Sequence, residues 1–418
     1  MGYLALAGGQ PLRRTPFPSW PVWEQAEINA VQAVVESGRW GATQGTEVRS
    51  FETEFAAYHE AAHGIAVVNG TVALKLALTA AGVGVGDEVI VPGYTFVATA
   101  TAALEIGAVP VFADIDAQTY TLDPDSAAAC VTPRTRAIIP VHLGGRPADM
   151  EALLALAQQY DLVVIEDAAQ AWGASWQERK VGTLGHIGCF SFQSSKNITA
   201  GEGGIMLTNH PTVAAMAQSL SNCGRQKDGA WYAHYILGGN YRLGELQGAL
   251  LRVQLQRYPQ HLQLRQANAT YLVQLLASVE GVTPLPHDQR VTANAYHIMF
   301  LRYQAAAFGG MPKVTFIAAL QAEGITGVQG GYSLPAYQQP VMQAKNFGLA
   351  TPPLFSGVHP QPPDYRTVSH PVTERACAEE AVWIRHNMLL GERRDMEDIV
   401  EAIRKIQRHH DELRWCLL

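Results

Sequence analysis

Two residues whose side chains could take part in a reaction lie at the ends of short apolar segments of this chain. Lys196 lies in "FSFQSSKNITAGEGG" (190–204), among small hydroxyl residues and just before a glycine-rich turn. In an apolar, hydroxyl-lined pocket a lysine can lose its proton and form a Schiff base with an aldehyde. Asp167 ends "LVVIED" (162–167), so its buried charge needs a metal, an arginine or a protonated pyridine nitrogen as partner. Taken singly, Lys196 could equally be a loop lysine at the surface.

Two further segments could bind an anion or a flat ring. In "VVNGTVAL" (67–74) a predicted strand runs through Gly70 and Thr71 into a predicted helix, whose free N–H groups could bind a phosphate. An ordinary helix start with Thr71 as N-cap is the alternative. Phe96 follows the strand end at Pro92 and could cover a flat ring or belong to the core.

The elements that must position these residues alternate along the chain. Strands are predicted at 64–68, 87–92, 108–114, 136–143, 162–167, 189–193 and 203–209. Stretches with helical periodicity, such as 71–82 and 149–161, lie between most of them. This alternation predicts an α/β fold, with a largely parallel sheet between helix layers and ligands at the carboxyl ends of the strands.

The pattern changes after about residue 210, where helical periodicity dominates to about residue 280. A Pro/Gly-rich region follows, notably 327–371, and residues 395–413 form one amphipathic pattern. We predict a large domain at 15–258, a smaller C-terminal α+β domain at 259–418, and an N-terminal segment, 1–14, that packs separately.

Composition argues against nucleic-acid-binding, membrane-spanning and secreted proteins. The 418 residues carry a formal net charge of -7, and no basic cluster indicates nucleic-acid binding. No apolar run is long enough to span a membrane, and none indicates a signal peptide. The five cysteines form no C-x-x-C pair, which predicts a reducing, cytoplasmic location.

One short motif suggests a different chemistry. His59-Glu60-Ala61-Ala62-His63 matches H-E-x-x-H, the pattern of zinc metalloproteases. That site needs both histidines on one helix. Helical periodicity covers 51–60, but Gly64 follows His63 directly and the chain then becomes strand-like. We therefore predict that His63 lies at or beyond the helix end, and we expect no metal. "GVGVGD" (82–87) precedes a strand, so it is a poor dinucleotide fingerprint.

Together, these segments resemble the DegT/DnrJ/EryC1/StrS family of sugar and cyclitol aminotransferases over about residues 15 to 405. The motifs that carry the resemblance are "NGTVAL", "DEVIVPGYTFVATA", "PVHLGGRPADM", "EDAAQAWGA", "FSFQSSKNITAGEGG" and "GGNYRLGELQGA". The resemblance implies the aspartate-aminotransferase (type I) fold and pyridoxal 5'-phosphate as cofactor.

The resemblance also implies a role for each matching residue. Lys196 corresponds to the internal-aldimine lysine, and Asp167 would keep the pyridine nitrogen protonated. Gln170 would contact the ring's phenolic oxygen and Phe96 would stack on the ring. The phosphate would be bound by Gly70, Thr71, Ser191 and, from the neighbouring subunit, Asn240. That last contact implies a homodimer with shared active sites.

The retained lysine favours transamination over the dehydratases of the family, which have histidine there. The implied reaction is a ping-pong transfer from glutamine or glutamate to a keto-cyclitol or keto-sugar. Residues 382–391 and the "SFQ" before Lys196 are similar to the branch of scyllo-inosose aminotransferases and aminohydroxybenzoate synthases. A nucleotide-linked 3- or 4-keto-sugar aminotransferase and a non-catalytic regulator are the alternatives. The candidate substrate residues are His142, Arg225, Tyr332 and His386, although His386 could be a packed core residue and Arg225 a solvated one.

Overall fold

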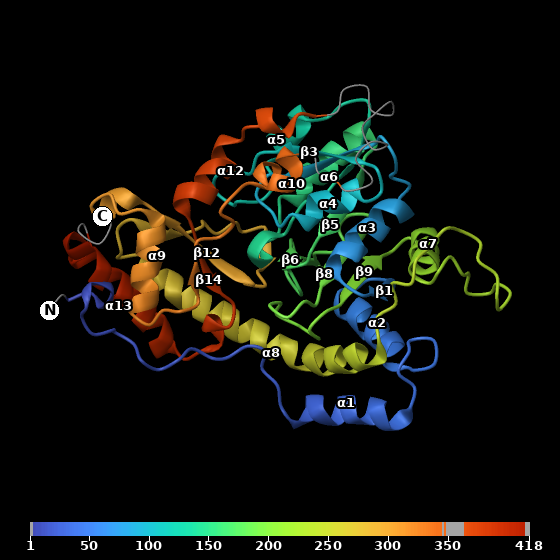
Figure 1. The fold of residues 1–418 in the computed structure, drawn as a ribbon, viewed down its shortest axis with the longest axis horizontal. Coiled ribbons are helices and arrows are strands. Elements are labelled where there is room, and N and C mark those ends of the chain that lie inside the picture. Colours follow the sequence, from blue (N-terminus) through green and yellow to red (C-terminus); the bar gives the residue numbers. More distant parts are fainter. Residues whose placement is uncertain (1–2, 345–346, 348–362, 414–418) are drawn as a thin grey trace.

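The computed structural model describes residues 3–344, 347 and 363–413. Part of the Pro/Gly-rich region at 327–371 lies outside these residues. A large α/β unit and a smaller sheet with its own helices lie side by side, and the long helix α8 (Glu245–Leu276) runs along both (Figure 1).

A seven-stranded sheet is the centre of the large unit. Its order is β1-β9-β8-β5-β4-β2-β3. The strands are β1 (His63–Val67), β2 (Glu88–Pro92), β3 (Val109–Ala113), β4 (Thr135–Ile138), β5 (Val163–Asp167), β8 (Ile187–Ser191) and β9 (Gly204–Thr208). All neighbouring pairs are parallel except those that β9 makes with β1 and β8. Each strand overlaps one of the predicted apolar runs, as expected for a sheet buried on both faces.

Two helix layers cover this sheet. One hydrophobic cluster contains side chains of α3, α4 and α7, and another contains those of α2, α5, α6 and α8. The first layer comprises α3 (Gly70–Ala80), α4 (Ala98–Leu104) and α7 (Pro211–Ser221). The second comprises α2 (Glu47–Tyr58), α5 (Pro124–Ala129), α6 (Met150–Tyr160) and part of α8. The predicted α/β class is confirmed.

The smaller unit is built on an antiparallel sheet with the order β10-β12-β14-β13. Its strands are β10 (Val282–Pro284), β12 (Ile298–Tyr303), β13 (Val328–Gln329) and β14 (Ala381–Arg385). Helices α9 (Lys313–Ala322) and α13 (Arg393–Arg408) bury their apolar faces against it in a common core. A short sheet of β11 (Val291–Ala293), β6 (Ser175–Trp176) and β7 (Arg179–Lys180) connects the two units.

The remaining helices are short or peripheral. They are α1 (Gln25–Ser37), α10 (Pro340–Gln343) and α12 (Pro371–Arg375). A 3-10 turn, η2 (Leu143–Gly145), follows β4.

The predicted domain division stays a prediction. Helix α8 continues without a break through residue 258, and the N-terminal segment contacts the smaller unit. Leu4 is buried in the core that α13 and β12 share, and Arg13 Nη1 lies 2.9 Å from Asp398 Oδ2. The predicted terminal helix at 395–413 ends earlier as an α-helix, at Arg408, and continues as a 3-10 turn at His410–Leu413.

The H-E-x-x-H segment is not a continuous helix. Helix α2 ends at Tyr58, so His59 is its C-cap and His63 begins β1. His59 is buried, with Nδ1 3.2 Å from Phe55 O and Nε2 accepting a 3.0 Å hydrogen bond from Gly173 N. The helix geometry that a zinc protease requires is therefore missing from this segment. Within the described part of the chain, no helix combines the length and apolar character needed to cross a bilayer.

Candidate active site

A cavity of about 490 Å³ opens at the carboxyl ends of β5 and β8. It brings together most of the residues singled out from the sequence, namely Gly70, Thr71, Phe96, Asp167, Gln170, Ser191, Lys196 and Tyr332. This is the edge of a parallel sheet where α/β folds bind their ligands. The cavity also receives residues of the smaller unit, because Ile298 and Trp383 form part of its wall.

Lys196 follows β8 in a tight turn, closed by a 2.9 Å hydrogen bond from its backbone N–H to Gln193 O. Burial lowers the pKa of the Lys196 ammonium from 10.5 to about 8, against the opposing effect of the Asp167 charge. Desolvation disfavours the charged amine, because the cavity cannot replace the hydration shell of an ammonium group. The neutral, nucleophilic form of Lys196 is therefore much more populated near neutral pH than in an ordinary lysine, while the ammonium form still predominates.

Asp167 ends β5, and its carboxylate is buried in the same cavity. Thr99 Oγ1 donates a 2.8 Å hydrogen bond to Asp167 Oδ2, and Ala169 N donates one of 3.2 Å to Oδ1. Burial raises the pKa of the carboxyl group, and the Thr99 hydrogen bond opposes this rise. These hydrogen bonds orient the carboxylate but do not neutralise it, so the site favours a cationic ligand group at Asp167.

The start of α3 provides an anion-binding surface beside β8. The N-cap is Asn69, whose side chain accepts a 2.9 Å hydrogen bond from Val72 N, so the alternative of Thr71 as N-cap is wrong. Gly70 is the first helical residue, and a Cβ at this position would lie 2.8 Å from Ser191 Cβ. Helix and strand therefore approach each other closely, and the first residues of the helix, Gly70 and Thr71, line the cavity together with Ser191. The N–H groups at the start of a helix have no partner within the helix and can bind an anion.

Phe96 and Gln170 form other parts of the wall. Phe96 is 58% exposed, so it does not belong to the core, and it lines the cavity. The orientation of the Gln170 amide is fixed because its Oε1 accepts a 2.7 Å hydrogen bond from Gly144 N. Its Nε2 lies 3.5 Å from the hydroxyl of Tyr332, which is the one predicted substrate residue that lines the cavity.

The other three candidate substrate residues lie elsewhere in this chain. His142 is fully buried, with Nε2 2.9 Å from Glu166 Oε2 and Nδ1 accepting from Ala148 N at 3.0 Å. His386 is also buried, with Nε2 3.0 Å from Ser195 O, and desolvation lowers its pKa well below the ordinary value. Arg225 follows α7 and does not line the cavity. His386 thus matches the alternative of a packed core residue, and His142 is buried in a similar way, because polar contacts within the fold occupy at least one nitrogen of each ring. Their predicted substrate roles stay predictions.

Asn240 is exposed and also lies outside the cavity of its own chain. It ends a segment after α7 that protrudes from the large unit (Figure 1). The large apolar side chains of this segment face solvent, with Trp231 89% and Leu237 97% exposed.

Sequence reasoning missed several residues of the site. Thr99 bonds Asp167, and His297, Trp383 and Glu202 line the cavity. Thr95 precedes α4 and Thr99 lies in its first turn, and their Oγ1 atoms are 2.9 Å apart, so two threonines four residues apart were a usable signal. His297 immediately precedes β12 and Trp383 lies in β14, far along the chain from the other site residues, and no local pattern indicates them.

Comparison with known proteins places the chain among aminotransferases. The model of the DegT/DnrJ/EryC1/StrS aminotransferase family matches residues 21–353. An L-glutamine:2-deoxy-scyllo-inosose aminotransferase of Streptoalloteichus tenebrarius is 38% identical over 433 residues, with 99% of each chain covered. A 3-amino-5-hydroxybenzoate synthase of Amycolatopsis mediterranei is 45% identical over 296 residues, covering 69% of this chain and 76% of that protein.

A solved structure gives the same result at the level of the fold. The crystal structure of 3-amino-5-hydroxybenzoic acid (AHBA) synthase matches with a TM-score of 0.83 at 35% identity, covering 97% of this chain and 99% of that one. The resemblance inferred from the motifs is therefore confirmed. The chain is an aminotransferase and belongs to the DegT/DnrJ/EryC1/StrS family.

Proposed function

We propose that the cavity binds pyridoxal 5'-phosphate, the cofactor that membership of this family implies. Three features of the cavity fit that group. Lys196 offers an amine with a lowered pKa, and Asp167 offers a buried carboxylate that lacks a neutralising partner at hydrogen-bonding distance among the described residues. The close approach of Gly70 to Ser191 leaves backbone N–H groups for a phosphate.

Each side chain then has a defined task. When bound, the cofactor supplies an electron sink for the substrate carbon that carries the amino group. Asp167 holds a proton on the pyridine nitrogen, because an ionised carboxylate stabilises the adjacent cation. Gln170 would contact the ring's phenolic oxygen, and Phe96 would stack on the ring, since both side chains line the cavity. Lys196 would hold the cofactor through its amine, and its Nζ would move the proton between the substrate carbon and the cofactor.

We propose a keto-cyclitol as the amino acceptor and glutamine or glutamate as the donor. The relatives that cover nearly the whole chain support this assignment, since one of them is an L-glutamine:2-deoxy-scyllo-inosose aminotransferase. One observation carries the proposal. Lys196 and Asp167 line the same cavity, in a chain that is similar over nearly its whole length to that aminotransferase. The cytoplasmic location predicted from the cysteines stays a prediction.

The test is a panel of ketones with glutamine as donor. We expect 2-deoxy-scyllo-inosose or scyllo-inosose to be aminated at least tenfold faster, in kcat/KM, than nucleotide-linked 3- or 4-keto sugars. Lys196→Arg should abolish turnover, whereas Lys75→Arg should not, because Arg can keep the ion pair of Lys75 with Glu105. Preference for the nucleotide-linked ketones would overturn the substrate assignment. Undiminished turnover in Lys196→Arg would overturn the assignment of the lysine.

We also propose that the active unit is a homodimer with shared sites. The solvent-facing Trp231 and Leu237 support this, because apolar side chains of this size are commonly covered by a partner. Asn240, at the end of the same segment, could then reach the phosphate of the neighbouring cavity.

Mixed dimers test this arrangement. Lys196→Ala and Asn240→Ala should each be inactive or nearly so as pure proteins. If Asn240 acts across the interface, a mixed dimer keeps one site with both native residues, and random mixing restores about a quarter of wild-type activity. A mixture with no more activity than its parents would show that Asn240 does not act across the interface.

A further inference from the structure

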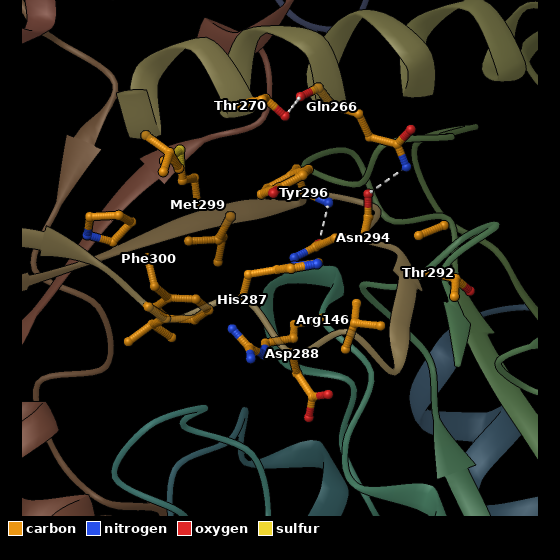
Figure 2. A pocket seen from close by; sticks show the side chains of 16 residues that line it. Arg146, Gln266, Thr270, His287, Asp288, Thr292, Asn294, Tyr296, Met299 and Phe300 are labelled. Carbon is orange, nitrogen blue, oxygen red and sulfur yellow. Dashed lines mark hydrogen bonds between the residues drawn. The ribbon is translucent and has the colours of Figure 1, made fainter. Parts of the chain in front are cut away.

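A second cavity of about 250 Å³ lies between η2, the C-terminal half of α8 and the segment around β11 and β12 (Figure 2). In the close-up, Gln266 and Thr270 descend from α8, and Arg146, Asp288 and Tyr296 lie below the helix. Ile298 lines both this cavity and the one around Lys196, and no other residue does so. The two cavities are therefore separate but share one wall.

Arg146 is the unusual residue of this second cavity. It is only 8% exposed, and its buried Nε has no hydrogen-bond partner. No ion pair joins Arg146 to a carboxylate among the described residues. Asp288 also lines the cavity and attracts the Arg146 guanidinium, but its Oδ2 is paired with Arg290 Nη2 at 2.8 Å and forms no ion pair with Arg146. A guanidinium carries five N–H donors, and burying a charged group without a partner is costly. An anion that binds beside Arg146 would explain why its Nε lacks a partner within the chain.

The backbone at Tyr296 is consistent with a built site. Its φ is 46°, in the left-handed region that aromatic residues rarely adopt. The conformation is held by a 2.9 Å hydrogen bond from Tyr296 N to Asn294 Oδ1. This geometry places Tyr296 in the wall that also contains Arg146. Strained residues of this kind concentrate at binding sites, where the surrounding structure fixes them.

The wall also limits the chemistry of the ligand. Val273, Leu285 and Phe300 provide apolar surface, which suits an organic group. Arg146 provides a cationic fork that matches the two oxygens of a carboxylate. The carboxylate of Asp288 lies in the same wall and disfavours a dianion such as phosphate.

From this combination, we propose that the second cavity binds a small organic carboxylate, with Arg146 donating to its two oxygens. This assignment is independent of the proposed cofactor and substrate, because Lys196 and Asp167 do not line the cavity.

The test measures binding of sodium propionate to the purified full chain by calorimetry. We compare Arg146→Gln with Arg394→Gln, which removes the same charge from an exposed position on α13. Thr270→Trp serves as a second cavity variant, because Thr270 is an exposed α8 residue at the cavity and its replacement does not disturb the core. Propionamide, the neutral analogue, and inorganic phosphate are the matched probes.

We expect propionate affinity to fall at least tenfold in Arg146→Gln and in Thr270→Trp, and to stay within twofold in Arg394→Gln. Propionamide should not bind at the same concentrations. Equal propionate affinity in Arg146→Gln and Arg394→Gln, or equal binding of propionamide, would overturn the site. Tighter binding of phosphate than of propionate would overturn the carboxylate assignment. Because the readout is binding, failure here is distinguishable from failure of the proposed transamination.

Discussion

Thr99 Oγ1 donates a 2.8 Å hydrogen bond to Asp167 Oδ2, which links the first turn of α4 to the end of β5. Both side chains are buried, so water does not compete for this contact. Together with the hydrogen bond from Ala169 N to Oδ1, this contact fixes the orientation of the carboxylate in the cavity. Thr99 is therefore a positioning residue that acts through Asp167.

Replacing Thr99 with Val should remove this hydrogen bond while keeping the side-chain shape. A hydrogen bond to a charged group is worth about 1.5–3 kcal/mol, so we expect kcat to fall about tenfold or more with little change in KM. Thr101→Val on the same helix is the control and should change kcat less than twofold. A larger effect on KM than on kcat would argue for direct substrate contact instead.

The pH dependence of cofactor capture should report the lowered pKa of Lys196. Only the neutral amine attacks an aldehyde, so the rate at which the apoenzyme captures pyridoxal phosphate should rise with pH and reach half-maximum near pH 8. The negative charge of Asp167 raises the pKa of Lys196. Asp167→Asn should therefore move the midpoint to lower pH, as followed by stopped-flow absorbance.

Asp161→Asn is the matched control for that shift, because Asp161 is the exposed C-cap of α6. Its midpoint should match the wild type. An upward shift in Asp167→Asn would contradict the sign of the electrostatic coupling.

Gly70→Ala should weaken cofactor binding specifically. The added Cβ would lie 2.8 Å from Ser191 Cβ, so α3 and β8 must separate where the phosphate is expected. Overpacking of this kind costs about 1–3 kcal/mol, which corresponds to about a fivefold or greater loss of pyridoxal phosphate affinity in an absorbance titration. Gly84→Ala is the control, since a Cβ there meets nothing within 4 Å. Equal affinities in the two variants would count against the phosphate position.

His142→Gln should lower stability without changing substrate affinity. His142 Nε2 and Glu166 Oε2 are 2.9 Å apart and fully buried, and Glu166 also accepts hydrogen bonds from Gly182 N and Leu184 N. Breaking a buried network of this kind costs about 2–4 kcal/mol, measurable as a lower free energy of unfolding in urea.

The KM for the ketone should stay within about twofold in that variant, apart from any loss of folded protein. His210→Gln, at the exposed start of α7, is the control and should leave both quantities unchanged. A raised KM at unchanged stability would instead support His142 as a substrate residue.

The sequence by itself determined the strand positions of the large sheet, because residues buried on both faces of a parallel sheet form uninterrupted apolar runs. It also determined the local motifs of Lys196, Asp167 and Gly70, since each follows or ends one of those strands. Only the tertiary structure decided what surrounds them. His297 and Trp383 reach the cavity because the smaller unit packs over the sheet edge, and this contact depends on long-range packing with no local periodicity. For the same reason, His142 and Arg146 have different surroundings although they are four residues apart. His142 is paired within the fold, whereas the buried Nε of Arg146 lies beside a second cavity without a partner.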